Sequence, residues 1–322
     1  MALFRYIKEG ENKIAGLAVF ALFYLFIGCK TEKKEVDKEL EAKPVREVVE
    51  IITNSMDFQV ADSISSGWHT FKYDNRSSET HFFLLDKYPE GRTIEDTEKE
   101  IGPVFQLGMD LINEGKAKEG FEAFNKLPEW FFKVAFVGGS GLVSPQNSSL
   151  TTLKLDPGYY IIECYVKMQN GKFHSSMGMA KALVVTNEIS QVTPPEPTLN
   201  VLISSNDGII FKDTVSSGSQ VFSVYFKDQI THENFVGHDV NLVRIDENAD
   251  IAILESWMNW ADPKGLISPA PEGFTFLGGV NDMVAGSTGY FEVDLAPGHY
   301  ALISEVPMAR SKSLFKPFIV IN

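Results

Sequence analysis

The chain has 322 residues, of which 43 are acidic and 29 basic, and its formal net charge at pH 7 is −14. Such an acidic chain is a poor candidate for binding nucleic acid or for a polybasic attachment to membranes, and it favours basic partners. The residues from about 47 to 322 suffice for two ordinary domains.

The N-terminus has the pattern of a secretory signal. Three basic residues precede an apolar run at 14–27, which is shorter than the roughly 20 residues that span a bilayer. We therefore predict a signal peptide at 1–28. The run closes on "FIGCK", which resembles the lipobox of bacterial lipoproteins, apart from Phe26 where leucine is usual. That resemblance implies acylation of Cys29 and a membrane-anchored protein of the cell envelope, facing the periplasm or the cell surface. An uncleaved signal would leave the same domains outside the cytoplasm.

The segment 29–46 is almost without apolar residues, and we expect it to be a charged tether. Removal of 1–28 takes away three basic and two acidic side chains, which leaves 26 and 41 and a net charge of −15. With Cys29 acylated, Cys164 is the one remaining thiol. In an oxidising compartment, such a thiol is a liability unless it is buried or bound to a metal.

The rest of the chain contains an internal repeat. "LDPGYY" at 155 matches "LAPGHY" at 295, "FVGG" at 136 matches "FLGG" at 276, and an interval of nineteen residues separates the paired glycine and proline in both copies. A matching Ser-Ser-Gly turn begins each copy. We predict a duplicated β domain, with copies at 47–188 and 199–322 and a proline-rich linker at 189–198.

Short alternating strands between Gly, Pro, Asn and Ser turns favour an all-β fold, a sandwich or Greek-key barrel in each copy. The segment from about 93–132 interrupts the first copy with apolar residues at helical spacing, so we predict a helical insertion there. A shorter counterpart in the second copy contains Trp257 and Trp260. These two side chains can stack on a ligand or pack within the insertion, and packing is the favoured interpretation.

The two copies differ around Cys164. The strand pleat places this side chain on the same face as apolar neighbours, and Ser304 takes its place in the second copy. Met179 corresponds to Leu314, and the first copy has five extra residues in a segment that contains His174. Three soft or nitrogen ligands are thus absent together from the second copy, which indicates one shared function.

A thiolate, imidazoles and a weak thioether form the donor set of a blue-copper site. The "PGYY" turn, the strand ending at Cys164, and then His174 and Met179 resemble the cupredoxin family of plastocyanin-like type 1 copper proteins. The upstream pattern of Asn75, a turn and His81 before an apolar run is also similar to that family.

The resemblance implies two tandem cupredoxin-like Greek-key β-sandwich domains, with one copper in the first. It implies that His81 and His174 are equatorial ligands, that Cys164 supplies the thiolate, and that Met179 is the weak axial ligand. His238 occupies the place of His81 in the second copy, where we expect a structural role. Phe82 departs from the family, which usually has asparagine there.

The function that follows is a one-electron carrier, with a basic redox protein as a candidate partner and the membrane bound through lipid. We found no hydrolase elbow, phosphate loop or paired zinc motif, and four protein ligands leave a type 1 copper no open position, so we predict that the chain is not an enzyme. A copper store or delivery protein is one alternative. The other is a metal-free surface lipoprotein for adhesion or assembly, in which Cys164 and Met179 merely fill the core.

Overall fold

Short β-strands make up most of the chain in the computed structural model, which describes residues 47–322. The predicted signal peptide, Cys29 and the tether lie outside the described residues. The first copy contains seven strands: β1 (Val48–Thr53), β2 (Ser63–Asn75), β3 (Leu84–Lys87), β4 (Ala135–Gly139), β5 (Asn147–Leu155), β6 (Gly158–Glu163) and β7 (Ala180–Ile189).

The second copy contains nine: β8 (Leu199–Ser204), β9 (Gly208–Ile210), β10 (Thr214–Ser216), β11 (Gly218–Phe226), β12 (Val240–Ile245), β13 (Phe274–Val280), β14 (Thr288–Leu295), β15 (Gly298–Ile303) and β16 (Phe315–Ile321). In the central strands of both copies, either every second side chain or every side chain is buried. These side chains belong to one apolar core that both copies share.

The strands form two sheets. The larger has eleven strands in the order β4-β3-β6-β7-β2-β5-β14-β11-β8-β9, with β1 paired to β2, and the smaller has the order β10-β16-β15-β12-β13. The antiparallel pairing of β5 with β14, centred on Thr151 opposite Phe291, joins strands of the two copies. The described residues form one compact unit, and the division at 47–188, 189–198 and 199–322 stays a prediction.

The two copies repeat the same local contacts. The Tyr160 hydroxyl donates to the carbonyl of Asp156 at 2.7 Å, and the Tyr300 hydroxyl donates to the carbonyl of Ala296 at 2.9 Å. Each tyrosine follows the "PG" turn by two residues, so the hydroxyl closes the same corner in both copies. The predicted all-β fold is confirmed, and the two copies repeat this local pattern.

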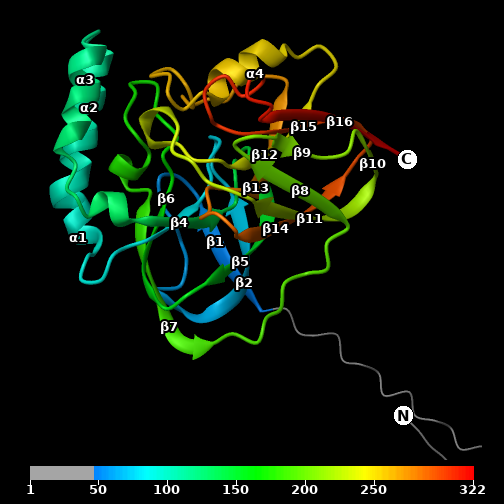
Figure 1. The fold of residues 1–322 in the computed structure, drawn as a ribbon, viewed down its shortest axis with the longest axis horizontal. Coiled ribbons are helices and arrows are strands. Elements are labelled where there is room, and N and C mark those ends of the chain that lie inside the picture. The colour runs from blue at the N-terminus through cyan, green and yellow to red at the C-terminus, as the bar shows by residue number, and fades with distance from the viewer. Residues whose placement is uncertain (1–46) are drawn as a thin grey trace, which may run out of the picture. The chain divides into compact units, whose positions relative to one another are not determined.

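The predicted helical insertion is confirmed between β3 and β4. Helices α2 and α3 stand beside β6 and β4 in Figure 1 and pack on a small core of their own. The insertion comprises α1 (Ile94–Asp96), the π-helical turn Thr97–Ile101, α2 (Gly102–Asn113), α3 (Ala117–Ala123) and two 3₁₀ turns, Phe124–Lys126 and Phe131–Lys133.

The second copy has a single helix at the matching place, α4 (Ile251–Met258), between β12 and β13. Trp257 on this helix is buried against Phe276, with 5.3 Å between ring centroids, as the packing interpretation predicted. Trp260, just after the helix, packs on Tyr165 and Phe173 of the first copy instead. Between residues 47 and 322, no helix has the length and apolar character needed to cross a membrane.

Candidate metal centre

Cys164 lies directly after β6, the strand held between β3 and β7. Its amide donates to the carbonyl of Met179 at 3.2 Å, which continues the pairing of β6 with β7 by one residue. The pleat turns Cys164 to the same side as Tyr160 and Ile162, and all three side chains are fully buried. The inward orientation expected from the alternation is therefore confirmed.

The loop between Cys164 and Met179 folds back on itself. The His174 amide donates to the carbonyl of Val166 at 2.8 Å, and the Met179 amide donates to the carbonyl of His174 at 3.0 Å. Between them, a 3₁₀ turn at Ser175–Met177 ends at Gly178, whose φ of 118° is strained for any residue with a side chain. These bonds hold the backbones of His174 and Met179 close to Cys164.

His81 reaches the same place from the segment before β3. Its amide donates to the carbonyl of Val143 at 3.1 Å, and the amide of Val143 donates back to His81 at 2.7 Å. The amide group of Asn75 also donates to the carbonyl of Val143 at 2.8 Å, which anchors the turn that precedes His81. The imidazole is consequently fixed by a short bridge rather than by a regular strand.

Three donor atoms meet in the interior. The Sγ atom of Cys164 lies 3.8 Å from Nδ1 of His81 and 3.8 Å from Nδ1 of His174, and the two Nδ1 atoms are 3.0 Å apart. All three residues have an exposed fraction of 0%. They form the one group of three or more His, Cys, Asp or Glu side chains at ligating distance within 47–322.

Burial sets the protonation of these groups. It lowers the pKa of His174 to about 4, and burial together with the neighbouring His174 lowers the pKa of His81 to about 3. Both imidazoles are therefore neutral at neutral pH, with lone pairs available to a metal. Burial also raises the pKa of the Cys164 thiol to about 12, so a metal must displace its proton to bind the thiolate.

The donor set fits a copper ion. Nitrogen and sulfur ligands bound at about 2.0 and 2.3 Å to one ion lie about 3 to 4 Å apart, and the three separations here fall in that range. Two facing imidazoles and one cysteine are the equatorial ligands typical of blue copper. The three residues are thus suited to a copper ion.

The surroundings of His174 add to this fit. Its Nε2 atom, which points away from the cluster, lies 3.3 Å from a carboxylate oxygen of Glu79. A carboxylate behind a metal-binding histidine fixes the ring orientation and makes the other nitrogen more basic. The Nε2 atom of His81 is buried without a hydrogen-bond partner among the described residues.

Met179 and Met177 differ in their surroundings. Met179 is fully buried in the core that contains Cys164, and its backbone bonds to both Cys164 and His174. Met177 is 49% exposed. Of the two methionines, Met179 is therefore the buried one whose backbone is bonded to the cluster residues, and its role as axial ligand stays a prediction.

The second copy lacks the cluster but keeps its frame. The amide of Ser304 donates to the carbonyl of Leu314 at 3.0 Å, as Cys164 does to Met179. The hydroxyl of Ser304 donates to Asp239 at 2.6 Å. Pairing registers place Asp239 at the position of Phe82 in the first copy, so a carboxylate fills the place where the family usually has asparagine.

His238 corresponds in register to His81, as the sequence predicted. Sequence reasoning missed its neighbour: Nε2 of His232 lies 3.1 Å from Nε2 of His238. Asp228 lies on the other side, 3.8 Å from Nδ1 of His238. The short spacing of the two histidines in the sequence was the available signal, but the turn at Glu233–Phe235 that brings them together has no clear pattern.

Neither protein-family models nor curated proteins match the chain. Similar solved structures include auracyanin A, a blue copper protein of Chloroflexus aurantiacus, at 20% identity and a TM-score of 0.27, over 44% of this chain and 98% of that one. A copper-containing nitrite reductase of Thermus scotoductus is similar at 12% identity and a TM-score of 0.22, over 85% of this chain and 61% of that one. A multicopper oxidase is similar at 10% identity and a TM-score of 0.21, over 85% and 88%.

The prediction that the chain is not an enzyme is wrong on this comparison. The nitrite reductase and the multicopper oxidase are enzymes by name, and both extend over most of the chain. The absence of a hydrolase or zinc motif therefore excludes no catalytic role.

Proposed function

We propose that this chain is a lipid-anchored copper protein that transfers single electrons through a type 1-like site. The observation that carries the proposal is the fully buried meeting of Sγ of Cys164 with Nδ1 of His81 and Nδ1 of His174 at 3.0–3.8 Å. Acylation of Cys29 and a basic redox partner belong to the same proposal and are supported by the sequence pattern and the net charge of −14.

Bound copper would supply a one-electron couple, and the chain's own residues set its environment. The neutral imidazoles of His81 and His174 present Nδ1 lone pairs, and the Glu79 carboxylate orients the ring of His174. The thiol of Cys164 releases its proton on binding, since the thiolate is the ligand. A buried site with ligands fixed by backbone hydrogen bonds changes little in shape between two charge states, which favours rapid electron exchange.

The experiment is a copper titration of the full-length protein followed by visible absorption and voltammetry. The proposal predicts stoichiometric binding, an intense thiolate-to-copper band and a reversible couple. Cys164→Ser should remove the band, because an alcohol does not donate as a thiolate does. Met179→Leu should keep the band and shift the potential, since an axial ligand tunes the site.

Met177→Leu is the matched control, because Met177 is two residues away and half exposed. It should change neither the band nor the potential. Copper that binds without colour and resists redox cycling would replace electron transfer with storage or delivery. Protein that binds no copper would leave a metal-free sandwich lipoprotein.

A further inference from the structure

A cavity of about 530 Å³ lies on the other side of the strand that carries Cys164. Its walls come from the helical insertion, from β3 and β6, and from loops of the second copy around 235–239, 260 and 281–282. A volume of this size suits a small organic molecule. Nothing in the copper proposal uses this cavity.

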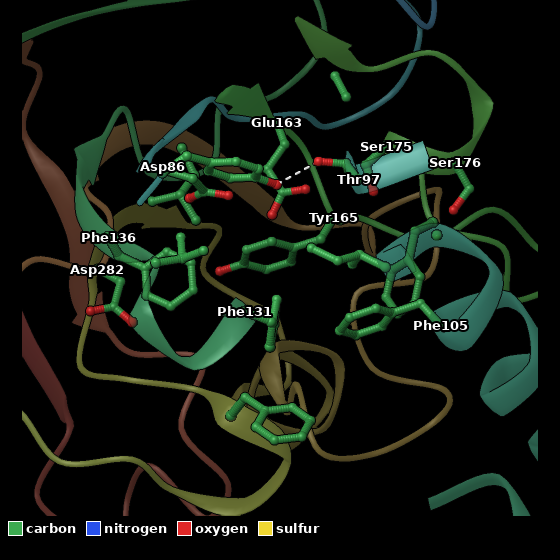
Figure 2. Close-up of a pocket in the computed structure, with 18 of the residues that line it drawn as sticks. Asp86, Thr97, Phe105, Phe131, Phe136, Glu163, Tyr165, Ser175, Ser176 and Asp282 are labelled. Carbon is green, nitrogen blue, oxygen red and sulfur yellow. Dashed lines mark hydrogen bonds between the residues drawn. The ribbon is translucent and has the colours of Figure 1, made fainter. Parts of the chain in front are cut away.

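The pleat of the chain explains its position. Side chains alternate across a strand, so Glu163 and Tyr165 point away from the side on which Cys164 meets the histidines, and both line the cavity. Figure 2 shows Asp86 beside Glu163 and the ring of Tyr165 reaching across the middle of the space. A molecule in the cavity would therefore lie against the two residues that flank Cys164.

The lining has an unusual composition. Eight aromatic side chains contribute to it, and five acidic ones, but no lysine, arginine or histidine does. The aromatic residues are Tyr88, Phe105, Phe131, Phe136, Tyr165, Phe173, Phe235 and Trp260, and the acidic ones are Asp86, Glu98, Glu163, Asp239 and Asp282. A set of carboxylates without a cation in an apolar cavity is costly, because each charge loses water and repels the others.

Two side chains in this wall each have one buried polar atom without a hydrogen-bond partner among residues 47–322. Asp86 is 5% exposed and its Oδ1 atom accepts no hydrogen bond, while Asn281 is 1% exposed and its Nδ2 atom donates none. Buried polar atoms in folded proteins are rarely left unsatisfied without a reason. Both atoms belong to side chains that line a cavity large enough for a ligand. The Oδ1 atom of Asp86 needs a donor, which an ammonium group supplies, whereas the Nδ2 group of Asn281 needs an acceptor, which a water molecule in the cavity can supply.

No basic side chain in the lining neutralises these carboxyl groups. Burial, followed by the neighbouring Glu163, raises the pKa of Asp86 well above its usual range. Burial, followed by Asp239, likewise raises the pKa of Asp282 well above its usual range. Asp282 accepts a hydrogen bond from Gln229 at 2.6 Å but has no ion-pair partner among the described residues. A positive charge placed between these groups would stabilise their ionised forms.

The wall distinguishes an organic cation from a metal ion. Its carboxylates contribute to no group of three ligands within ligating distance, since the one such group in 47–322 is His81, Cys164 and His174. Aromatic faces attract ammonium groups and bury apolar bodies. The chemistry of the wall therefore matches a protonated amine attached to an aromatic or other apolar body.

We propose that this cavity is a binding site for an aromatic amine in its ammonium form, with the ammonium group among Asp86, Glu163 and Asp282 and the ring among the phenylalanines. The site is a second one, separate from the copper centre, and it forms without copper. Bound amine contacts Glu163 and Tyr165, the two residues that flank Cys164 in the sequence.

The test is calorimetric titration of the copper-free full-length protein with three probes that share a phenyl ring and differ in charge. These are 2-phenylethylamine, 2-phenylethanol and 3-phenylpropionate. An ammonium group with an ordinary pKa near 10 is charged at pH 7. The amine should bind at least about tenfold more tightly than the alcohol, and the anion should bind least.

Glu163→Gln and Asp282→Asn should each reduce the amine's advantage over the alcohol by about tenfold, whereas Glu188→Gln, on an exposed residue of β7, should leave it unchanged. Using two variants guards against misfolding of either one, and the alcohol's affinity reports whether the cavity is intact. The proposal is overturned if no probe binds at concentrations of about 10 mM, if alcohol or anion binds as tightly as amine, or if the control variant weakens binding as much.

Repeating the titration with copper-loaded protein separates the two proposals. Amine binding without any copper band would support the amine site and overturn the proposal of a type 1-like copper site. A copper band without amine binding would do the reverse.

Discussion

Replacing Glu163 with glutamine should stabilise the copper-free protein much more at pH 8 than at pH 4.5. Burial raises the pKa of Glu163 to about 7 in the folded protein, whereas an unfolded chain has the ordinary value near 4.3. Between these values, the folded state holds a proton that the unfolded state has lost. The free energy of unfolding contributed by this group therefore falls as pH rises from about 4 to about 7.

A pKa difference of about 2.7 units corresponds to about 3.7 kcal/mol. Glutamine carries no charge at any of these pH values, and its amide can donate to the carboxyl of Asp86, which shares a hydrogen bond with Glu163 in the native chain. Allowing for an imperfect replacement of that bond, Glu163→Gln should gain about 1 to 3 kcal/mol at pH 8. At pH 4.5 Glu163 is neutral in the folded chain and partly ionised in the unfolded chain, so the gain should fall below about 1 kcal/mol.

Urea unfolding at pH 4.5 and pH 8, followed by tryptophan fluorescence, measures this difference. Glu188→Gln serves as the control, because its exposed carboxyl should give no change at either pH. A variant that is no more stable than the native chain at pH 8 would refute the reasoning. So would an equal gain at both pH values, since that would point to packing rather than to ionisation.

Gly139→Ala should lower the free energy of unfolding by more than about 3 kcal/mol, because a Cβ there would lie 1.8 Å from the carbonyl oxygen of Phe83. Gly102→Ala is the control: its Cβ would meet nothing closer than 3.5 Å, so the variant should be as stable as the native chain or more stable. Urea unfolding of both variants measures the difference. Tyr160→Phe should lower the free energy of unfolding by about 1 kcal/mol, because the Tyr160 hydroxyl donates to a backbone carbonyl at 2.7 Å. An unchanged urea midpoint would contradict this. Cys29→Ala should move the protein from the membrane fraction to the soluble fraction, and a variant that stays with membranes would show that Cys29 is not its anchor.

Much of the fold was predictable because its signals are local. Alternation in the strand "YYIIE" fixes which side faces the core, so the burial of Tyr160 and Cys164 follows from the pleat alone. The two "PG" turns, each followed by a tyrosine, are short-range features that the structure repeats in both copies. Helical spacing likewise identified the insertion at 93–132.

The candidate metal site was also predictable in its members, although its geometry was not. The loop from Cys164 to Met179 contributes three of the four predicted donors within sixteen residues, so their proximity is nearly a local property. His81 is 83 residues from Cys164, and the family resemblance, rather than any local pattern, brought it into the set. The 3.0–3.8 Å separations depend on the bridge between His81 and Val143, which is a tertiary contact.

By itself, the sequence determined the periodicities: which faces of strands and helices are apolar, where turns occur, and which residues recur between the copies. The tertiary structure alone decided how the copies meet. It paired β5 with β14, placed Trp260 of the second copy against Tyr165 of the first, and joined their acidic side chains around one cavity. The physical reason is that the periodicity of a sequence indicates which face of its own helix or strand a residue occupies. A cavity wall, in contrast, is built from elements far apart in the chain, and their periodicities do not indicate which of them pack together.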